Sequence, residues 1–227
     1  MTARKSKAHT APKDDAALKE AVLMAALAHV PFEGFTPSVL TRAGSEAGAG
    51  DLALARLFPD GPLSLVEAFS DWADARMNAR LEEAKLPAKR IRDRIRGAVM
   101  SRLDVLRPHK EAARRAAAFL TLPPHAALGA KLLYRTTDAM WRAAGDSATD
   151  FNFYTKRAIL AGVYSATLMR WFTDESEDES DTQSFLANRI EDVMRFEKLK
   201  AEFRKRAKAW PSLGDILGGS TRRGFRR

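Results

Sequence analysis

The stretch that decides the fold covers residues 138–172 and reads DAMWRAAGDSATDFNFYTKRAILAGVYSATLMRWF. Gly145 permits a backbone reversal after a first helical pattern, and Thr149 or Asp150 supplies a side-chain oxygen that can cap the next helix. That next helix, residues 150–172, is the most apolar in the chain. Charged residues interrupt its apolar run, which is too short to span a bilayer, so we expect a central core helix.

Helical signals continue on both sides of this stretch, without a convincing strand. Apolar residues recur at spacings of three and four, and proline or glycine marks the end of most patterns. The sequence therefore predicts an all-α protein. The expected helices cover residues 14–30, ended by Pro31, then 37–48, 49–57, 62–84, 87–103, 110–120, 125–143 and 150–172, and a last long helix after the acidic loop 174–181.

Composition and charge limit the possible function classes. The chain has 227 residues, 45% of them hydrophobic, and its formal net charge of +9 favours anionic partners such as nucleic acid or acidic lipid headgroups. Cysteine is absent, which excludes disulfides, thiolate metal sites and cysteine nucleophiles. No apolar run is long enough for a membrane span, and residues 1–14 lack the apolar core of a secretory signal. We therefore expect a cytoplasmic protein, peripheral on the inner face of a membrane, or its mitochondrial matrix equivalent.

No catalytic constellation stands out. The four histidines lie far apart without an HExxH pair, no phosphate-binding loop follows a strand, and no serine has a GxSxG context. Paired acidic residues are typical of solvated faces and loops. The sequence predicts no metal site, no cofactor and no catalytic residue, so we expect a binding protein and not an enzyme.

Residues 14–61 form a long helical pattern followed by two short ones joined by a glycine-containing turn. This arrangement resembles the helix-turn-helix of TetR-family regulators, which read DNA with the third helix. The corresponding segment, residues 49–57, reads AGDLALARL. Only Arg56 is cationic there, and Asp51 has the wrong sign for phosphate, so we expect DNA reading to be lost. A triplet of alanine-rich helices also occurs in ordinary bundles, and a ligand-responsive DNA-binding regulator stays the alternative function.

A second resemblance is more specific. Within residues 138–164 the sequence combines Trp141, an AGD turn, a TDFN helix start and a TKR triplet, and residues 185–194 read FLANRIEDVM. This looks like the Coq-nine family of ubiquinone-biosynthesis accessory proteins. The resemblance is strong over residues 138–194, weaker from Ala17 to Asp138, and poor at both termini. It implies a TetR-like bundle with a degenerate helix-turn-helix and a larger C-terminal helical ligand-binding domain.

The same resemblance implies the ligand and the partners. The ligand is a lipid or isoprenoid quinone, the protein partner is the di-iron demethoxyubiquinone hydroxylase, and a homodimer is expected because helical relatives commonly dimerise. From the residues alone, Phe153 and Tyr154 are typical of core packing, whereas the resemblance places them on a surface. The family often has tryptophan where this chain has Phe153, which loses the indole donor. The implied partner-binding residues are Asp138, Met140, Asp150, Phe153, Tyr154 and Arg157.

The resemblance also implies a ligand chamber, and residues on the helical patterns 125–143 and 150–172 are the candidates for lining it. An ordinary core would use the same residue types, so this alternative stays open. The candidate lipid-binding residues are Leu132, Tyr134, Leu160, Tyr164 and Leu168.

The C-terminal stretch, residues 195–227, carries eleven Lys or Arg against three acidic residues. A basic helix followed by tryptophan and aliphatic residues suits an anionic membrane surface, and the family resemblance also implies an amphipathic membrane helix. Glycine and proline would shorten such a helix, and a solvated basic tail is the alternative. The candidate membrane-contacting residues are Trp210, Leu213, Ile216 and Leu217, and the expected organisation is a tail at 1–13, the helix-turn-helix unit at 14–61, the binding domain at 62–209 and a membrane-contacting tail at 210–227.

Overall fold

The computed structural model describes residues 12–84, 90–146 and 151–209, and within these ranges helices joined by turns and short loops form the fold, with no strand. The all-α prediction is therefore confirmed for this part of the chain. The α-helices are α1 (Pro12–Glu33), α2 (Pro37–Glu46), α3 (Asp51–Leu57), α4 (Pro62–Glu83), α5 (Ile91–Leu106), α6 (Lys110–Thr121), α7 (Ala126–Ala143), α8 (Phe151–Phe172) and α9 (Ser180–Ala209), with short 3-10 turns at Arg107–His109, Pro123–His125 and Glu177–Glu179.

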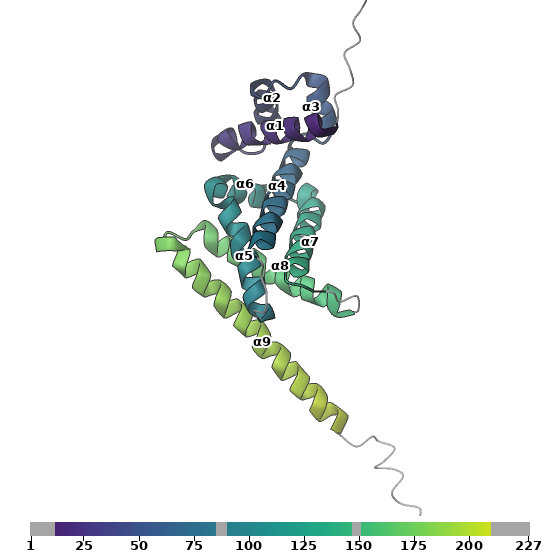
Figure 1. Ribbon diagram of the computed structural model, residues 1–227, viewed down its shortest axis with the longest axis vertical. Helices are drawn as coiled ribbons and strands as arrows, with labels where there is room; N and C mark the ends of the chain where they lie inside the picture. Colours follow the sequence, from purple (N-terminus) through teal and green to yellow (C-terminus); the bar gives the residue numbers. More distant parts are fainter. Residues whose placement is uncertain (1–11, 85–89, 147–150, 210–227) are drawn as a thin grey trace, which may run out of the picture.

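Helices α1, α2 and α3 form a small unit at one end of the molecule (Figure 1). Val22 and Val30 of α1 and Val39 of α2 are fully buried where the first two helices pack. Gly44 of α2 lets α3 approach closely, because a Cβ at this position would lie 2.9 Å from a methyl carbon of Leu54. The small unit is therefore held by a short apolar seam between α1 and α2 and by the close approach of α3 to Gly44.

Pro31 does not end the first helix as predicted. Helix α1 continues to Glu33, and Gly34, with φ +72°, donates its N–H to the carbonyl of Val30 at 2.9 Å. A proline in the last turn removes only one intrahelical hydrogen bond, and the burial of Val30 holds that turn in place. The third helix was also expected from Ala49 but begins at Asp51.

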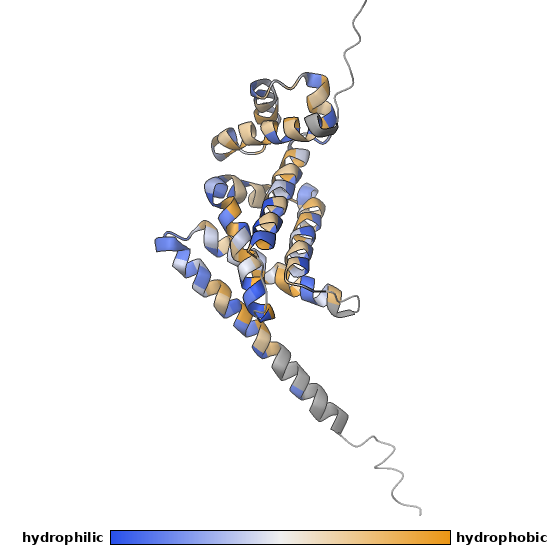
Figure 2. Ribbon diagram, viewed as in Figure 1, coloured by the Kyte–Doolittle hydropathy of each residue, from blue (hydrophilic) through white to orange (hydrophobic). Residues whose placement is uncertain are grey.

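Helices α4 to α8 pack together as the larger part of the molecule, and α9 runs along α5 and α8 before extending beyond them (Figure 1). Figure 2 shows hydrophilic and hydrophobic residues mixed along the coloured parts of α4 to α8, as expected where a helix buries one face. The predicted core helix α8 places Leu160, Tyr164 and Trp171 in the interior. Ile91, at the first turn of α5, is exposed.

The corner between α8 and α9 is closed by a buried carboxylate. Asp174 accepts hydrogen bonds from the backbone N–H and hydroxyl of both Ser176 and Thr182, which caps the start of α9. Burial raises the pKa of Asp174, but these four donors outweigh burial and hold the pKa well below its ordinary range. Nearby, the indole N–H of buried Trp171 donates to Glu179 at 2.6 Å. These contacts fix the direction in which α9 leaves the bundle.

Candidate functional site

A cavity of about 390 Å³ lies among α4, α5, α6, α7 and α8. Its size falls within the range of small-molecule sites, about 300–1,000 Å³. Small residues on α6 and α7 leave the space, and larger aliphatic and aromatic residues complete the wall. The apolar lining consists of Val66, Phe69, Leu106, Ala113, Ala116, Ala117, Leu120, Ala126, Gly129, Ala130, Leu132, Leu133, Leu168 and Met169.

Three of the five candidate lipid-binding residues, Leu132, Tyr164 and Leu168, line this cavity. Leu160 is buried in the core away from the lining. Tyr134 is 42% exposed and lines a different groove, so its assignment to the chamber is corrected. Apolar and aromatic residues a few positions apart on one helix face different neighbours. Residue type alone therefore could not show which of the five candidates line the cavity.

The cavity changes character from one end to the other. Ala126 and Ala130 on α7 and Met169 on α8 are exposed and form the outer end, with Met169 at 52% exposure. At the inner end, Arg102 and Tyr164 are both buried and polar. We call the outer residues the mouth and the inner polar residues the floor.

The floor is a hydrogen-bonded cluster that the sequence interpretation missed. The guanidinium of Arg102 donates from Nε to the Tyr164 hydroxyl at 3.1 Å, from Nη2 to the Ser70 hydroxyl at 3.3 Å, and from Nη1 to the Ser70 carbonyl at 3.5 Å and to the carboxylate of Asp74. The other oxygen of Asp74 accepts from Thr136 at 3.1 Å. Burial raises the pKa of Asp74, while the charge of Arg102 opposes that rise.

The cluster left a signal in the sequence. Arg102 lies three residues after Val99 and four before Leu106, so it falls on the apolar face of α5 and not on the solvent-facing side. A lone arginine on a buried stripe requires a buried carboxylate partner. That partner, Asp74, lies 28 positions earlier in the sequence, so spacing alone could not identify it.

The corner between α7 and α8 carries an exposed aromatic pair. The side chain of Tyr154 is 66% exposed, and Phe153 beside it is half-buried, with ring centroids 5.1 Å apart in an edge-on arrangement. The guanidinium carbon of Arg157 lies 3.3 Å from the centroid of the Phe153 ring. Tyr154 thus lies at the surface, while Phe153 is partly covered.

Two other residues of the implied patch are buried. Met140 is fully buried, and Arg157 is 2% exposed, so neither can offer its side chain directly to a partner in this conformation. Arg157 instead supports the patch from beneath, donating from Nε to Asp138 at 2.6 Å and from Nη1 to Asp146 at 3.2 Å. Asp150 lies outside the described residues, as do the candidate membrane-contacting residues Trp210, Leu213, Ile216 and Leu217.

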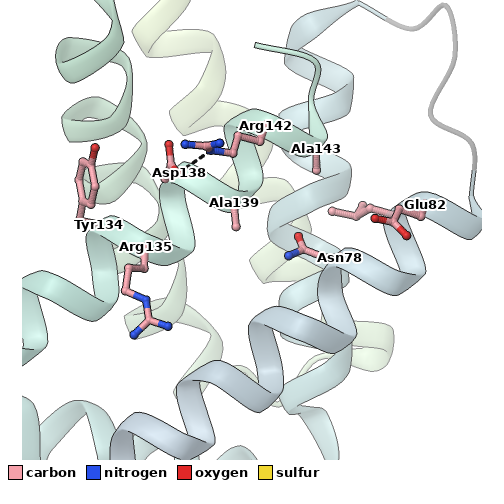
Figure 3. Close-up of a pocket in the computed structure, with 9 residues that line it drawn as sticks. Asn78, Glu82, Tyr134, Arg135, Asp138, Ala139, Arg142 and Ala143 are labelled. Carbon is pink, nitrogen blue, oxygen red and sulfur yellow. Dashed lines mark hydrogen bonds and ion pairs between the residues drawn. The ribbon is translucent and has the colours of Figure 1, made fainter. Parts of the chain in front are cut away.

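Asp138 also borders an open, polar groove of about 710 Å³ between α4 and α7. Figure 3 shows Tyr134, Asp138 and Arg142 of α7 along one side of this groove, and Asn78 and Glu82 of α4 along the other. Asp138 accepts a hydrogen bond from Arg142 at 2.7 Å within it. Asp138 therefore connects the groove to the aromatic pair through Arg157, which donates to Asp138 and lies over the Phe153 ring.

The helix-turn-helix unit has no free cationic reading face in α3. Arg56, the only cationic residue of α3, forms an ion pair with Asp15 in which one N–H···O contact measures 2.8 Å. Leu52 is 86% exposed on the same short helix, where a side chain that reads DNA bases would be polar. These contacts favour a unit that no longer reads DNA.

Within residues 12–84, 90–146 and 151–209, no cluster of three or more His, Cys, Asp or Glu side chains could hold a metal ion. Over the same ranges, every helix is too short or too polar to cross a membrane.

Comparison with known proteins identifies the family. The COQ9 family model matches residues 126–197, which cover α7, α8 and the first part of α9. The mitochondrial ubiquinone biosynthesis protein COQ9 of Rattus norvegicus is 38% identical over 78% of this chain, and that of Homo sapiens is 36% identical over the same share. The corresponding Schizosaccharomyces pombe protein is 30% identical, and the chain covers 68% of it. The chain belongs to the COQ9 family.

The rat and human relatives are named as ubiquinone biosynthesis proteins. The chain spans 59% of the length of the rat protein and 58% of the human protein, and their names place those proteins in mitochondria. The COQ9 fold of this chain is similar to a TetR transcriptional regulator from Nitrosomonas europaea, with a TM-score of 0.62, 22% identity and coverage of 77% of this chain and 96% of the regulator. The TetR-like fold predicted from the sequence is thus confirmed.

Proposed function

We propose that this chain is a non-enzymatic accessory protein that binds a lipid or isoprenoid quinone intermediate in the cavity among α4 to α8 and presents it to the demethoxyubiquinone hydroxylase at a membrane surface. The observation that carries the proposal is the cavity itself, with its apolar wall and its exposed mouth. The family membership supports the choice of pathway.

The cavity offers a physical reason for an accessory protein. Moving a polyprenylated molecule through water exposes apolar surface at a cost of about 25 cal/mol per Å². A chamber lined by alanine, leucine and phenylalanine side chains replaces that exposure with apolar contacts. The protein would lower the cost of transfer between bilayer and hydroxylase without changing any covalent bond.

The partner surface in this proposal consists of Asp138, Phe153 and Tyr154, which we call the docking patch. Exposed aromatic side chains held by charged neighbours have the composition of interface hot spots. Tyr154 lies about 22 Å along α8 from Met169 at the mouth, taking ~1.5 Å per residue. A hydroxylase bound at the docking patch would therefore lie near enough to receive a ligand from the mouth.

The membrane part of the proposal rests on the sequence. The excess of basic residues in 195–227 favours an anionic leaflet, and α9, whose last part belongs to this stretch, extends beyond the other helices (Figure 1). Phe196 of α9 is exposed, next to the first of these basic residues. The homodimer stays a prediction.

Blocking the cavity tests ligand binding. Ala117 on α6 lines the cavity, whereas Ala118, its neighbour on the same helix, is exposed and does not. We expect Ala117→Phe to reduce the lipid that co-purifies with the protein, measured by mass spectrometry of an organic extract, and Ala118→Phe to leave it unchanged. An extract free of lipid from gently purified wild-type protein, or equal lipid in both variants, would contradict the proposal.

A capture assay tests the docking patch. Immobilised hydroxylase should retain the wild-type chain, and Tyr154→Ala should lose most of this retention because it removes the exposed ring. Phe32→Ala is the matched control, since Phe32 is an exposed aromatic residue at the end of α1, outside the docking patch. Equal retention of Tyr154→Ala and the control would show that the docking patch is misplaced.

A further inference from the structure

We infer that the buried floor selects the head of the ligand: the cavity takes an uncharged ring or head bearing carbonyl-type acceptor oxygens, inserted head first, with its apolar chain trailing to the mouth. This inference rests on the proposed ligand-binding function. It goes beyond that function by naming the residues that orient the ligand and the head chemistry that they accept.

The first step is the count of hydrogen-bond donors at the floor. A guanidinium has five N–H donors, and four of those of Arg102 have acceptors on Tyr164, Ser70 and Asp74. Among the described residues, the fifth N–H of Arg102 and the hydroxyl hydrogens of Tyr164 and Ser70 have no acceptor. The floor therefore offers donors to whatever occupies the cavity.

The second step is charge. The positive charge of buried Arg102 is already balanced by Asp74, a part-buried carboxylate whose side chain is 15% exposed. An anionic head would add a second negative charge to a pair that is neutral as a unit, and would lose its hydration without gaining a free cation. A neutral oxygen acceptor satisfies the unused donors without this cost.

The third step is the direction of the gradient. Arg102, Tyr164 and Thr136 are the buried polar residues of the lining and lie among buried apolar side chains, while exposed Ala130 and Met169 form the mouth. A molecule with a polar head and an apolar chain satisfies both ends only if its head lies deepest. A chain longer than the cavity would then leave through the mouth.

Three probes of one chain length separate the alternatives: a benzoquinone carrying a decyl chain, decylbenzene, and decanoate. Each competes with the neutral dye Nile red for the full-length protein. One added neutral hydrogen bond corresponds to about 5-fold in affinity, so the quinone should bind about 5- to 10-fold more tightly than decylbenzene. Decanoate should bind more weakly than the quinone.

Tyr164→Phe removes one floor donor, and the ratio of the quinone affinity to the decylbenzene affinity should fall towards one. Ser70→Ala should lower the same ratio, and it serves if Tyr164→Phe does not fold. Tyr134→Phe is the control, because Tyr134 is exposed and lies outside this cavity, so the ratio should stay at its wild-type value.

Equal binding of the quinone and decylbenzene, an unchanged ratio in both floor variants, or tightest binding of decanoate would each overturn the inference while leaving the cavity as a ligand site. If none of the three probes displaced Nile red, the proposed ligand-binding function would fail, and the inference with it.

Discussion

Replacing Gly145 with alanine should destabilise the α7–α8 corner that builds the docking patch. Gly145 has φ +81° at the end of α7, where its N–H donates to the carbonyl of Arg142 at 2.9 Å and the N–H of Asp146 donates to the carbonyl of Trp141 at 3.0 Å. A Cβ in this left-handed conformation costs about 1–2 kcal/mol. It would also lie 2.9 Å from Nη1 of Arg94, a flexible side-chain end that can move.

The expected loss in the free energy of unfolding is therefore about 1–2 kcal/mol, or a fall of about 2–8 °C in Tm for a chain of this size. Gly162→Ala is the matched control, because Gly162 lies within α8 with nothing within 4 Å of an added Cβ. Alanine in a helix interior should raise stability by about 0.5–1 kcal/mol. Urea unfolding followed by circular dichroism measures both variants. Equal or increased stability of Gly145→Ala would refute the account of this corner.

Three further variants test the support beneath the docking patch and the start of α9. Arg157→Met should lower the free energy of unfolding by about 3 kcal/mol, measured by urea unfolding, because it breaks a buried ion pair. It should also weaken hydroxylase capture, because Phe153 loses the guanidinium that lies over its ring. Normal capture would show that Phe153 does not need this contact. Met140→Ala should lower the free energy of unfolding by about 2–5 kcal/mol in the same assay, because Met140 is fully buried. The folded variant should still be captured by the hydroxylase. Loss of capture by folded protein would indicate that Met140 contacts the partner. Asp174 has a lowered native pKa, so its contribution is complete above the ordinary value of 3.8 and is lost as the pH falls below it. As the pH falls below 4, the free energy of unfolding of Asp174→Asn should therefore decrease less than that of the wild type. Equal decreases in thermal unfolding at acid pH would contradict this.

Apolar periodicity predicted the helices because each of them buries one face, and this signal is local. It placed α8 as the core helix and gave its C-terminal end, Phe172, as the structure has it. The predicted helix end at Pro31 was wrong, because the burial of Val30 holds the last turn of α1 in place beyond the proline. Helix ends are decided by a few contacts that a periodic pattern does not contain.

The candidate site was predictable only in part because residue type does not reveal which way a side chain faces. Tyr134 and Tyr164 are both aromatic residues on apolar helices, yet one lines the polar groove and the other the cavity floor. Met140 matched a family position and still lies fully buried. The Arg102–Asp74 pair joins two helices, and a single sequence shows no coupling between positions so far apart.

The most direct test of the central claim is a crystal structure of this chain grown with the decyl-substituted benzoquinone. The account predicts electron density within the cavity among α4 to α8, with a ring oxygen within hydrogen-bond distance of the Tyr164 hydroxyl and the chain passing Met169 at the mouth. A cavity filled by its own side chains, with the quinone bound on the outer surface or absent at saturating concentration, would contradict it.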